Sequence, residues 1–159
     1  MDEILTILEK NAVETRESIG RQLNLPAEEV ARRIAAFERE GIIRGYQAIL
    51  NEDALGIEKV TAVIEVKITP QREGGFDQIA DRISRFPEVR SVYLMSASYD
   101  LLLFVEGATL REVAGFVSER LASLQGVVST STHFMLKTYK RFGVLMHEKK
   151  SDERLDVTP

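Results

Sequence analysis

The chain has 159 residues, 44% of them hydrophobic and 29% charged, which is typical of a globular protein with one or two domains. It contains no cysteine, which excludes disulfides, thiolate metal sites and cysteine catalysis, and its net charge of −4 argues against broad binding of nucleic acids. No apolar run approaches the ~20 residues of a membrane span and no signal-peptide pattern opens the chain, so we expect a cytoplasmic protein without a membrane partner.

The N-terminal part has the spacing of helices. The first helix carries a short apolar face, and a second is expected from an N-cap at Thr15 to Leu23. A third helix follows Pro26, which suits a first helical turn because its missing N–H costs nothing there, and it ends at Gly41. Residues 42–49 are expected to be extended. Three short helices followed by a ribbon predict a winged helix-turn-helix, a DNA-binding fold.

The third helix carries the first candidate site. Steps of about 100° per residue place four residues opposite its buried face. These are Glu28, Arg32, Ala35 and Arg39. Arg32 can reach guanine edges or phosphates, and Glu28 can accept a hydrogen bond from cytosine. The alternative is a solvated helix with the i,i+4 ion pairs Glu28–Arg32 and Glu29–Arg33.

The charge of this region adds a condition. Residues 1–50 hold nine acidic and seven basic residues. DNA binding therefore requires that the basic residues gather on one face, and tight binding requires a dimer. In the extended segment, Arg44 and Tyr46 can contact phosphates, although they fit ordinary surface positions equally well. Together the DNA-binding candidates are Glu28, Arg32, Arg33, Arg39, Arg44 and Tyr46.

The apolar period changes to two after a linker. The expected elements are a strand at 60–68 ended by Pro70, a helix after Gly74-Gly75, strands at 89–96 and 100–106, a helix from Thr109 that buries Leu110 and ends at Gly126, and a strand at 127–139. This βαββαβ order predicts a ferredoxin-like unit, and hence an α+β protein. The predicted divisions are a winged helix-turn-helix domain at 1–50, a linker at 51–58, the ferredoxin-like domain at 59–140 and a charged tail at 141–159 that we expect to be largely disordered.

The strand from Leu101 to Val105 is apolar at every position. A half-buried strand alternates, so this run predicts that both faces are covered, one by the chain's own helices and the other by a second copy of the protein. The polar turn before it, Ser96–Asp100, would then lie beside a subunit boundary.

That turn is the second candidate site. Its residues are Ser96, Ala97, Ser98, Tyr99 and Asp100. Asp100 can pair with the ammonium group of a ligand, while Ser96 and Ser98 donate hydrogen bonds to the carboxylate of the same ligand. Such a site would bind an amino acid without catalysis. We expect D100A to abolish such binding and leave the fold intact. The alternative is an Asx-type turn in which Asp100 bonds its own backbone.

No catalytic or metal constellation is present. His133 has no neighbouring carboxylate, cysteine or second histidine at ligand spacing in the sequence, and no phosphate-binding glycine loop or nucleophile motif occurs. We therefore expect no enzyme activity, no metal and no cofactor.

Joined in this order, the motifs resemble the Lrp/AsnC family of transcription regulators. The resemblance covers about residues 2–140 and rests on Val30–Ile34, Phe37–Tyr46, Leu55-Gly56, Phe86–Val89, Ser98–Leu102 and Gly126–Thr132 with Lys140. Phe86–Leu94 and Val127–Leu136 especially resemble a Bacillus-type subgroup. Two departures are Ala97, where the family has glycine in the turn, and Pro26, where it has a serine before the recognition helix.

The resemblance implies a winged-helix domain joined to a ferredoxin-like ligand-binding and assembly domain. It also implies a homodimer, in some members an octamer, with an amino acid or related metabolite bound near the turn. We expect a sequence-specific regulator that binds double-stranded DNA at a palindromic operator and responds to such an effector. The alternative is a metabolite-binding or assembly module with weak or lost DNA binding, which the acidic N-terminal half favours.

Overall fold

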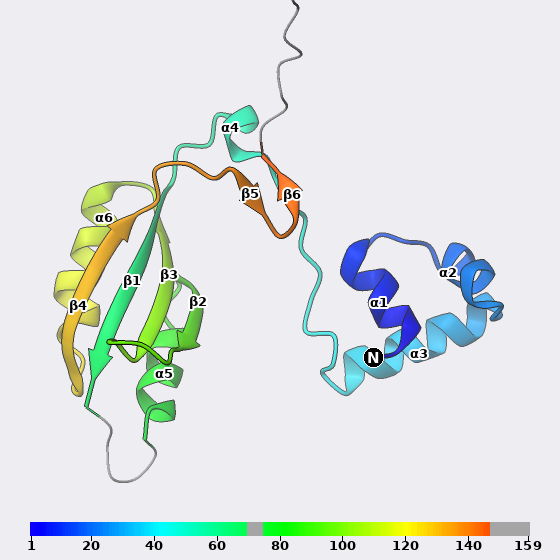
Figure 1. Cartoon of the computed structure of the whole chain (residues 1–159), viewed down its shortest axis with the longest axis horizontal. Helices are drawn as coiled ribbons and strands as arrows, with labels where there is room; N and C mark the ends of the chain where they lie inside the picture. Colours follow the sequence, from blue (N-terminus) through cyan, green and yellow to red (C-terminus); the bar gives the residue numbers. More distant parts are fainter. Residues whose placement is uncertain (70–74, 147–159) are drawn as a thin grey trace, which may run out of the picture. The chain divides into compact units, whose positions relative to one another are not determined.

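The computed structural model describes residues 1–69 and 75–146 and divides the chain into two compact units, Met1–Leu50 and Asn51–Pro159 (Figure 1). Among the described residues, no helix is long and apolar enough to cross a membrane. The expectations for Pro70, for Gly74 and for the tail from residue 147 lie outside the described residues.

The first unit consists of helices α1 (Glu3–Lys10), α2 (Arg16–Leu23) and α3 (Ala27–Arg39). Side-chain oxygens cap the first two helices: Asp2 accepts from Ile4 N, and Thr15 accepts from Ser18 N, which confirms the predicted cap. The small core is built from one apolar stripe of each helix. Its fully or nearly buried members are Ile4, Leu8, Ile19 and Val30.

The turn between α2 and α3 is set by backbone geometry. Asn24 takes the left-handed conformation with φ 53°, and Leu25 N donates to Gly20 O at 2.8 Å. Gly20 is buried, and a Cβ there would lie 2.6 Å from Leu25 O, so only glycine allows this close approach. Pro26 is the N-cap residue of α3 and provides no side-chain cap. The sequence predicted it in the first helical turn, which begins one position later, at Ala27.

Helix α3 ends in a Schellman motif. Gly41 has φ 69°, its N–H bonds Glu38 O, and Ile42 N donates to Phe37 O at 2.8 Å. The predicted stop at Gly41 is therefore confirmed. The ribbon expected after it is absent: residues 42–50 contain no helix or strand, because no neighbouring segment in the described chain supplies ladder hydrogen bonds to them.

The second unit contains a four-stranded antiparallel sheet in the order β2-β3-β1-β4. Its strands are β1 (Val60–Ile68), β2 (Val89–Leu94), β3 (Leu101–Gly107) and β4 (Val127–Phe134). Helices α5 (Asp77–Ser84) and α6 (Leu110–Gly115) lie on one face (Figure 1). They bury Ile79, Ile83 and Val113 against Ile64 and Leu103. This is the expected βαββαβ arrangement.

The second helix differs from the prediction after its start at Thr109. Beyond α6 it widens into the π-helix η1 (Phe116–Leu121), with Ala122 N donating to Val117 O five residues back. The hydroxyl of Ser118 donates to the carbonyl oxygens of Ala114 and Gly115, and this competition with the helix backbone accompanies the widening. Leu110, expected in the core, is 56% exposed, while Phe116 is buried in the core instead.

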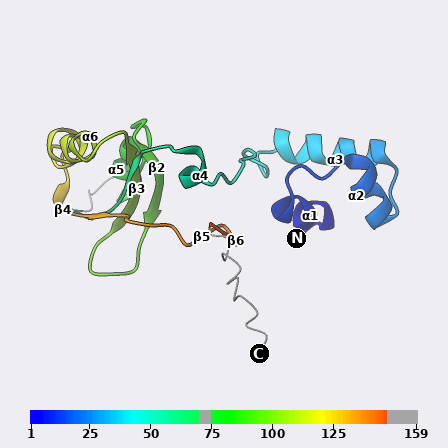
Figure 2. The same ribbon diagram turned by 90° about the horizontal axis from the view of Figure 1, so that it is seen from above.

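Two further segments have more structure than expected. The linker contains a one-turn helix, α4 (Glu52–Leu55), with Asn51 as its N-cap. The last strand stops at Phe134, five residues early. The chain then forms a hairpin of β5 (Lys140–Arg141) and β6 (Val144–Leu145), most of it within the tail expected to be disordered from residue 141. Figures 1 and 2 show this hairpin beside α4.

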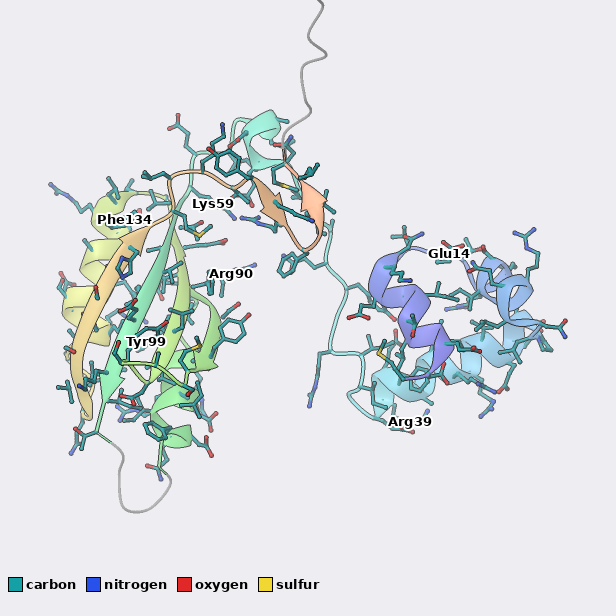
Figure 3. All side chains as sticks on the ribbon, in the orientation of Figure 1. Glu14, Arg39, Lys59, Arg90, Tyr99 and Phe134 are labelled. Atoms are coloured by element: carbon teal, nitrogen blue, oxygen red, sulfur yellow. The ribbon has the colours of Figure 1, made fainter. Side chains whose placement is uncertain are left out.

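Charged side chains join α4 to the hairpin and to the sheet. Glu52 Oε1 accepts from Lys59 Nζ at 2.8 Å and from Arg141 Nη1 at 2.9 Å, and Lys59 also donates to Glu106 at 2.9 Å (Figure 3). Burial raises the pKa of Glu52, but the hydrogen bonds from Lys59 and Arg141 outweigh it, so this pKa is lowered overall. The network fixes the start of the second unit, and no local sequence signal predicted it.

Candidate DNA-binding helix and effector turn

The exposed face of α3 is the one that the sequence predicted. Glu28, Arg32, Ala35 and Arg39 are all exposed, opposite the fully buried Val30. The Arg32 side chain is 71% exposed. A helix docked in a major groove needs such a face, with small residues where the backbones approach. Figure 3 shows Arg39 near the C-terminal end of the helix.

The ion pairs on this helix differ from those predicted. Glu29 accepts two hydrogen bonds from Arg32, from Nε at 2.8 Å and from Nη2 at 2.7 Å, and a third from Arg33 Nε at 2.8 Å. The hydrogen bonds from Arg32 and then from Arg33 lower the pKa of the Glu29 carboxyl to about 2. The Glu29–Arg33 pair is thus confirmed, but the expected Glu28–Arg32 pair is wrong, because the i,i+3 carboxylate offers Arg32 a two-pronged contact.

The residues after α3 fold back on its end. Tyr46 donates its hydroxyl to Glu38 Oε1 at 2.9 Å, and burial, followed by this bond, raises the pKa of Tyr46. The Arg44 guanidinium lies against Gly41, where a Cβ would come 3.2 Å from Arg44 Cζ. Both side chains are exposed, so the segment carries one cation and one aromatic ring beside the candidate helix.

The candidate effector turn lies between β2 and β3. Ser96, Ala97 and Ser98 are exposed, while Tyr99 and Asp100 are half-buried. Tyr99 lies at the turn end of the sheet in Figure 3. Because three of its residues are exposed to solvent in a single chain, a ligand bound there would need further walls.

Asp100 has a structural partner that the sequence could not show. Its Oδ2 accepts from Ile68 N at 2.8 Å, its own N–H donates to Val66 O at 3.0 Å, and Met95 N donates to its carbonyl at 2.8 Å. The Asp100 side chain therefore bonds the end of β1. The Asx alternative, in which this side chain bonds the backbone of its own turn, is wrong. We therefore expect D100A to lower the stability of the fold as well as any ligand binding, because the substitution removes the acceptor for Ile68 N.

The open face of the sheet is partly apolar. On β3, Leu101, Leu103 and Val105 are fully buried under the helices, whereas Leu102 and Phe104 point to the other face and are half-buried. The exposed Tyr93 packs edge-on against Phe104, with ring centroids 6.1 Å apart. This strand alternates in burial, so the apolar residues of its second face remain uncovered in one chain.

The same open face carries His133, 3.5 Å from Glu65 Oε1 on the adjacent strand. A carboxylate that is distant in the sequence thus neighbours this histidine, because the pairing of β1 with β4 brings Val63 opposite His133. One carboxylate and one imidazole do not make a metal site, and no group of three potential ligands occurs in the described residues.

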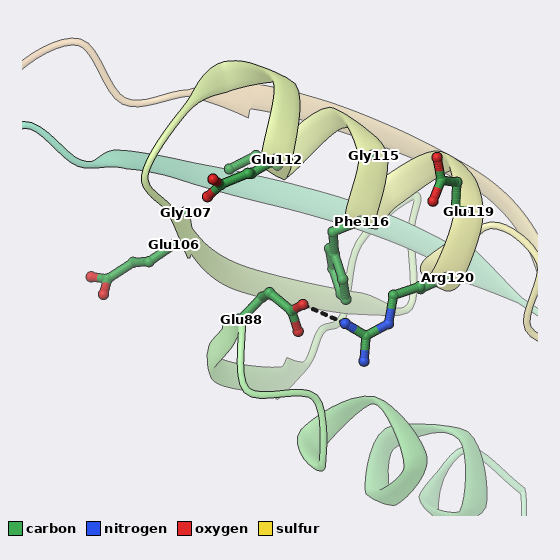
Figure 4. Close-up of a pocket in the computed structure, with 9 residues that line it drawn as sticks. Glu88, Glu106, Gly107, Glu112, Gly115, Phe116, Glu119 and Arg120 are labelled. Carbon is green, nitrogen blue, oxygen red and sulfur yellow. Dashed lines mark hydrogen bonds and ion pairs between the residues drawn. The ribbon is translucent and has the colours of Figure 1, made fainter.

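A cavity of about 270 Å³ lies at the other end of β3 (Figure 4). Its charged lining residues are Glu88, Glu106, Glu112, Glu119 and Arg120. Arg120 pairs with Glu88 and lies over the Phe86 ring, 4.5 Å from its centroid. Four carboxylates with one paired arginine disfavour the α-carboxylate of an amino acid. The cavity also lies at the Glu106–Gly107 end of β3, whereas the turn precedes Leu101 at the opposite end, so it is not the predicted effector site.

Both halves of the chain match known protein families. Residues 61–145 match the Lrp/AsnC ligand binding domain, and residues 3–44 match a winged helix-turn-helix DNA-binding family. The matches follow the order of the two compact units.

Individual relatives agree. The chain is 45% identical over 158 residues to the uncharacterized HTH-type transcriptional regulator YugG of Bacillus subtilis (strain 168), covering 99% of this chain and 95% of that protein. It is 32% identical over 119 residues to the proline dehydrogenase transcriptional activator of Rhodobacter capsulatus, covering 75% and 77%.

Solved structures agree as well. The transcriptional regulator NMB0573/L-Met complex from Neisseria meningitidis superposes with a TM-score of 0.69 at 26% identity, over 89% of this chain and 93% of that one. The resemblance seen in the sequence, including that to a Bacillus-type subgroup, is confirmed. The protein belongs to the Lrp/AsnC family and is a DNA-binding transcriptional regulator with a ligand-binding domain, not an enzyme.

Proposed function

We propose that this regulator binds a palindromic operator through α3 and that an amino acid or a related small metabolite at the Ser96–Asp100 turn changes its assembly or its DNA affinity. The observation that carries the DNA-binding part is the exposed face of α3, held at a fixed angle to α2 by the close contact at Gly20. Arg32, Arg33 and Arg39 supply cations to this face, and Arg44 and Tyr46 supply phosphate contacts beside it.

The test of the DNA-binding part begins with selection of fragmented host genomic DNA on the purified protein, at two salt concentrations. We expect a few palindromic promoter fragments. The R32A variant should weaken binding to the most enriched fragment by about fivefold or more, the value of a lost base contact. Arg111 is an exposed arginine of α6, so R111A removes the same charge from the other unit and serves as the control.

The effector part is supported by chemistry and by a relative. The turn offers the hydroxyls of Ser96 and Ser98 and the Asp100 carboxylate, which suit the carboxylate and the ammonium of an amino acid. The related Neisseria protein was solved as a complex with L-Met. The glycine of the family is Ala97 here, and a Cβ at that position restricts how closely a ligand approaches the backbone. We therefore expect an effector that differs from that of glycine-bearing members.

Calorimetric titration with each of the twenty amino acids tests this part, using D100N, which keeps an acceptor for Ile68 N but loses the charge. Loss of binding in D100N with an unchanged unfolding midpoint supports the site. An isotherm identical to that of the unmodified protein removes Asp100 from it.

The uncovered apolar residues of the open sheet face support a homodimer, and an octamer of four dimers is the larger assembly that we propose. Absence of any enriched DNA fragment even at low salt would favour the second candidate, a metabolite-binding or assembly module. The observation that favours it is that Glu29 already occupies two of the arginines on α3.

A further inference from the structure

The arginines of α3 are held in place before any DNA arrives. Arg32 meets Glu29 side-on, through Nε and Nη2, which fixes the plane of its guanidinium. A lone exposed arginine would sample many rotamers, and ordering it on DNA would cost conformational entropy. The contact therefore removes part of that cost in advance.

The side-on contact leaves the recognition edge of Arg32 available. Guanidinium has five N–H donors, and Nε with one N–H of Nη2 are used by Glu29. The remaining end-on pair, on Nη1 and Nη2, has no partner among the described residues. That pair is the fork that reads guanine O6 and N7 in a major groove.

Glu29 can perform this task because of its position. Its side chain is 27% exposed, against 71% for Arg32, so the carboxylate is less accessible to solvent than the guanidinium that it holds. It also accepts from Arg33 Nε, and Arg33 Nη1 lies 3.6 Å from Asp2 Oδ2 at the start of α1. The carboxylate is thus itself braced by a second arginine that reaches toward α1.

We infer that Glu29 is a positioning residue for operator recognition: it presents the end-on edge of Arg32 to a base and withholds Arg32 and Arg33 from indiscriminate phosphate contacts. This rests on the proposed role of α3. A missing carboxylate should therefore raise the affinity for any DNA and lower the preference for the operator.

The experiment compares E29Q with E17Q in the full-length protein. Glu17 is an exposed glutamate in the first turn of α2, without an ion pair in the described residues, so E17Q makes the same charge change, also in the first turn of a helix. The probes are the most enriched genomic duplex and a scrambled duplex of equal length, each titrated at several salt concentrations. Thermal unfolding of both variants confirms that they fold.

We expect the ratio of scrambled to operator Kd to fall about fivefold or more in E29Q, the lower range for a bidentate arginine–guanine contact, and to stay unchanged in E17Q. The slope of log affinity for scrambled DNA against log salt should steepen by about one for each arginine released. In an R32A background, E29Q should cause no further loss of preference, because Glu29 acts through Arg32, whereas R33A should leave the effect of E29Q in place.

Equal gains on both duplexes in E29Q would overturn the inference, since Glu29 would then only oppose phosphate binding. A ratio that falls equally in E17Q, or that still falls in the R32A background, would overturn it too. If the unmodified protein shows no operator preference at all, the proposed DNA-binding mode fails, which is a different result from a preference that E29Q leaves intact.

Discussion

Gly20 is the position on which the geometry of the helix-turn-helix depends most directly. A Cβ built there would lie 2.6 Å from Leu25 O and 3.6 Å from Ala27 N. Leu25 O is backbone and cannot swing aside, so G20A must push the turn and α3 away from α2. The hydrogen bond from Leu25 N to Gly20 O is strained by the same movement.

Two opposing effects decide the sign of the change. In an open helical position alanine is favoured over glycine by about 0.8–1.0 kcal/mol. Overpacking typically costs about 1–3 kcal/mol, so at Gly20 we expect a net destabilisation of about 0–2 kcal/mol. Domains are stable by roughly 0.05–0.15 kcal/mol per residue, which makes this a large fraction of the stability of the small first unit.

Amide hydrogen exchange on the full-length protein measures the effect in each unit separately. G20A should reduce protection in α1, α2 and α3 and leave the second unit unchanged. Gly115 provides the control, since it is also helical but has nothing within 4 Å of its Cβ, so G115A should stabilise or leave unaffected the second unit. If G20A instead increases protection in the first unit, the backbone contact does not limit helix packing and the reasoning is refuted.

Three further predictions concern the second unit. First, the folded-state pKa of Glu52 lies below its unfolded value, so the stabilising contribution of Glu52 is present above pH 4.5 and is lost as the pH falls through the folded pKa. Amide hydrogen exchange should therefore show α4 and the hairpin losing protection in acid. E52Q should lose the same protection at neutral pH. Second, D100A leaves the N–H of Ile68 without its acceptor and should lower the free energy of unfolding by about 1–3 kcal/mol in urea titrations, against little change for D100N. Third, F104E places a charge on the apolar open face and should weaken self-association by tenfold or more in sedimentation equilibrium.

Each of these has a clear contrary result. Hairpin protection that is independent of pH and unchanged in E52Q would show that Glu52 does not hold α4. Equal unfolding midpoints for D100A and D100N would show that the hydrogen bond from Ile68 N to Asp100 does not stabilise the fold. An unchanged dimer constant in F104E would exclude the open sheet face as the interface.

The sequence determined the local features of this protein because neighbouring residues decide them. The cap at Thr15, the stop at Gly41 and the period-two strand at Val60–Ile68 all follow from a few adjacent side chains. The exposed face of α3 follows in the same way from helical spacing. The order and spacing of these motifs were enough to indicate the family, which the comparisons then confirmed.

Tertiary structure decided whatever joins residues distant in the chain. Asp100 bonds Ile68, thirty-two positions away, and Arg141 bonds Glu52, eighty-nine away, and neither partner carries a local signal. Strand pairing brought Glu65 to His133, and the choice of Arg32 between Glu28 and Glu29 depended on which carboxylate could meet the guanidinium side-on, at Nε and Nη2. Such contacts are selected by the packing of whole elements, so spacing along the chain cannot reveal them.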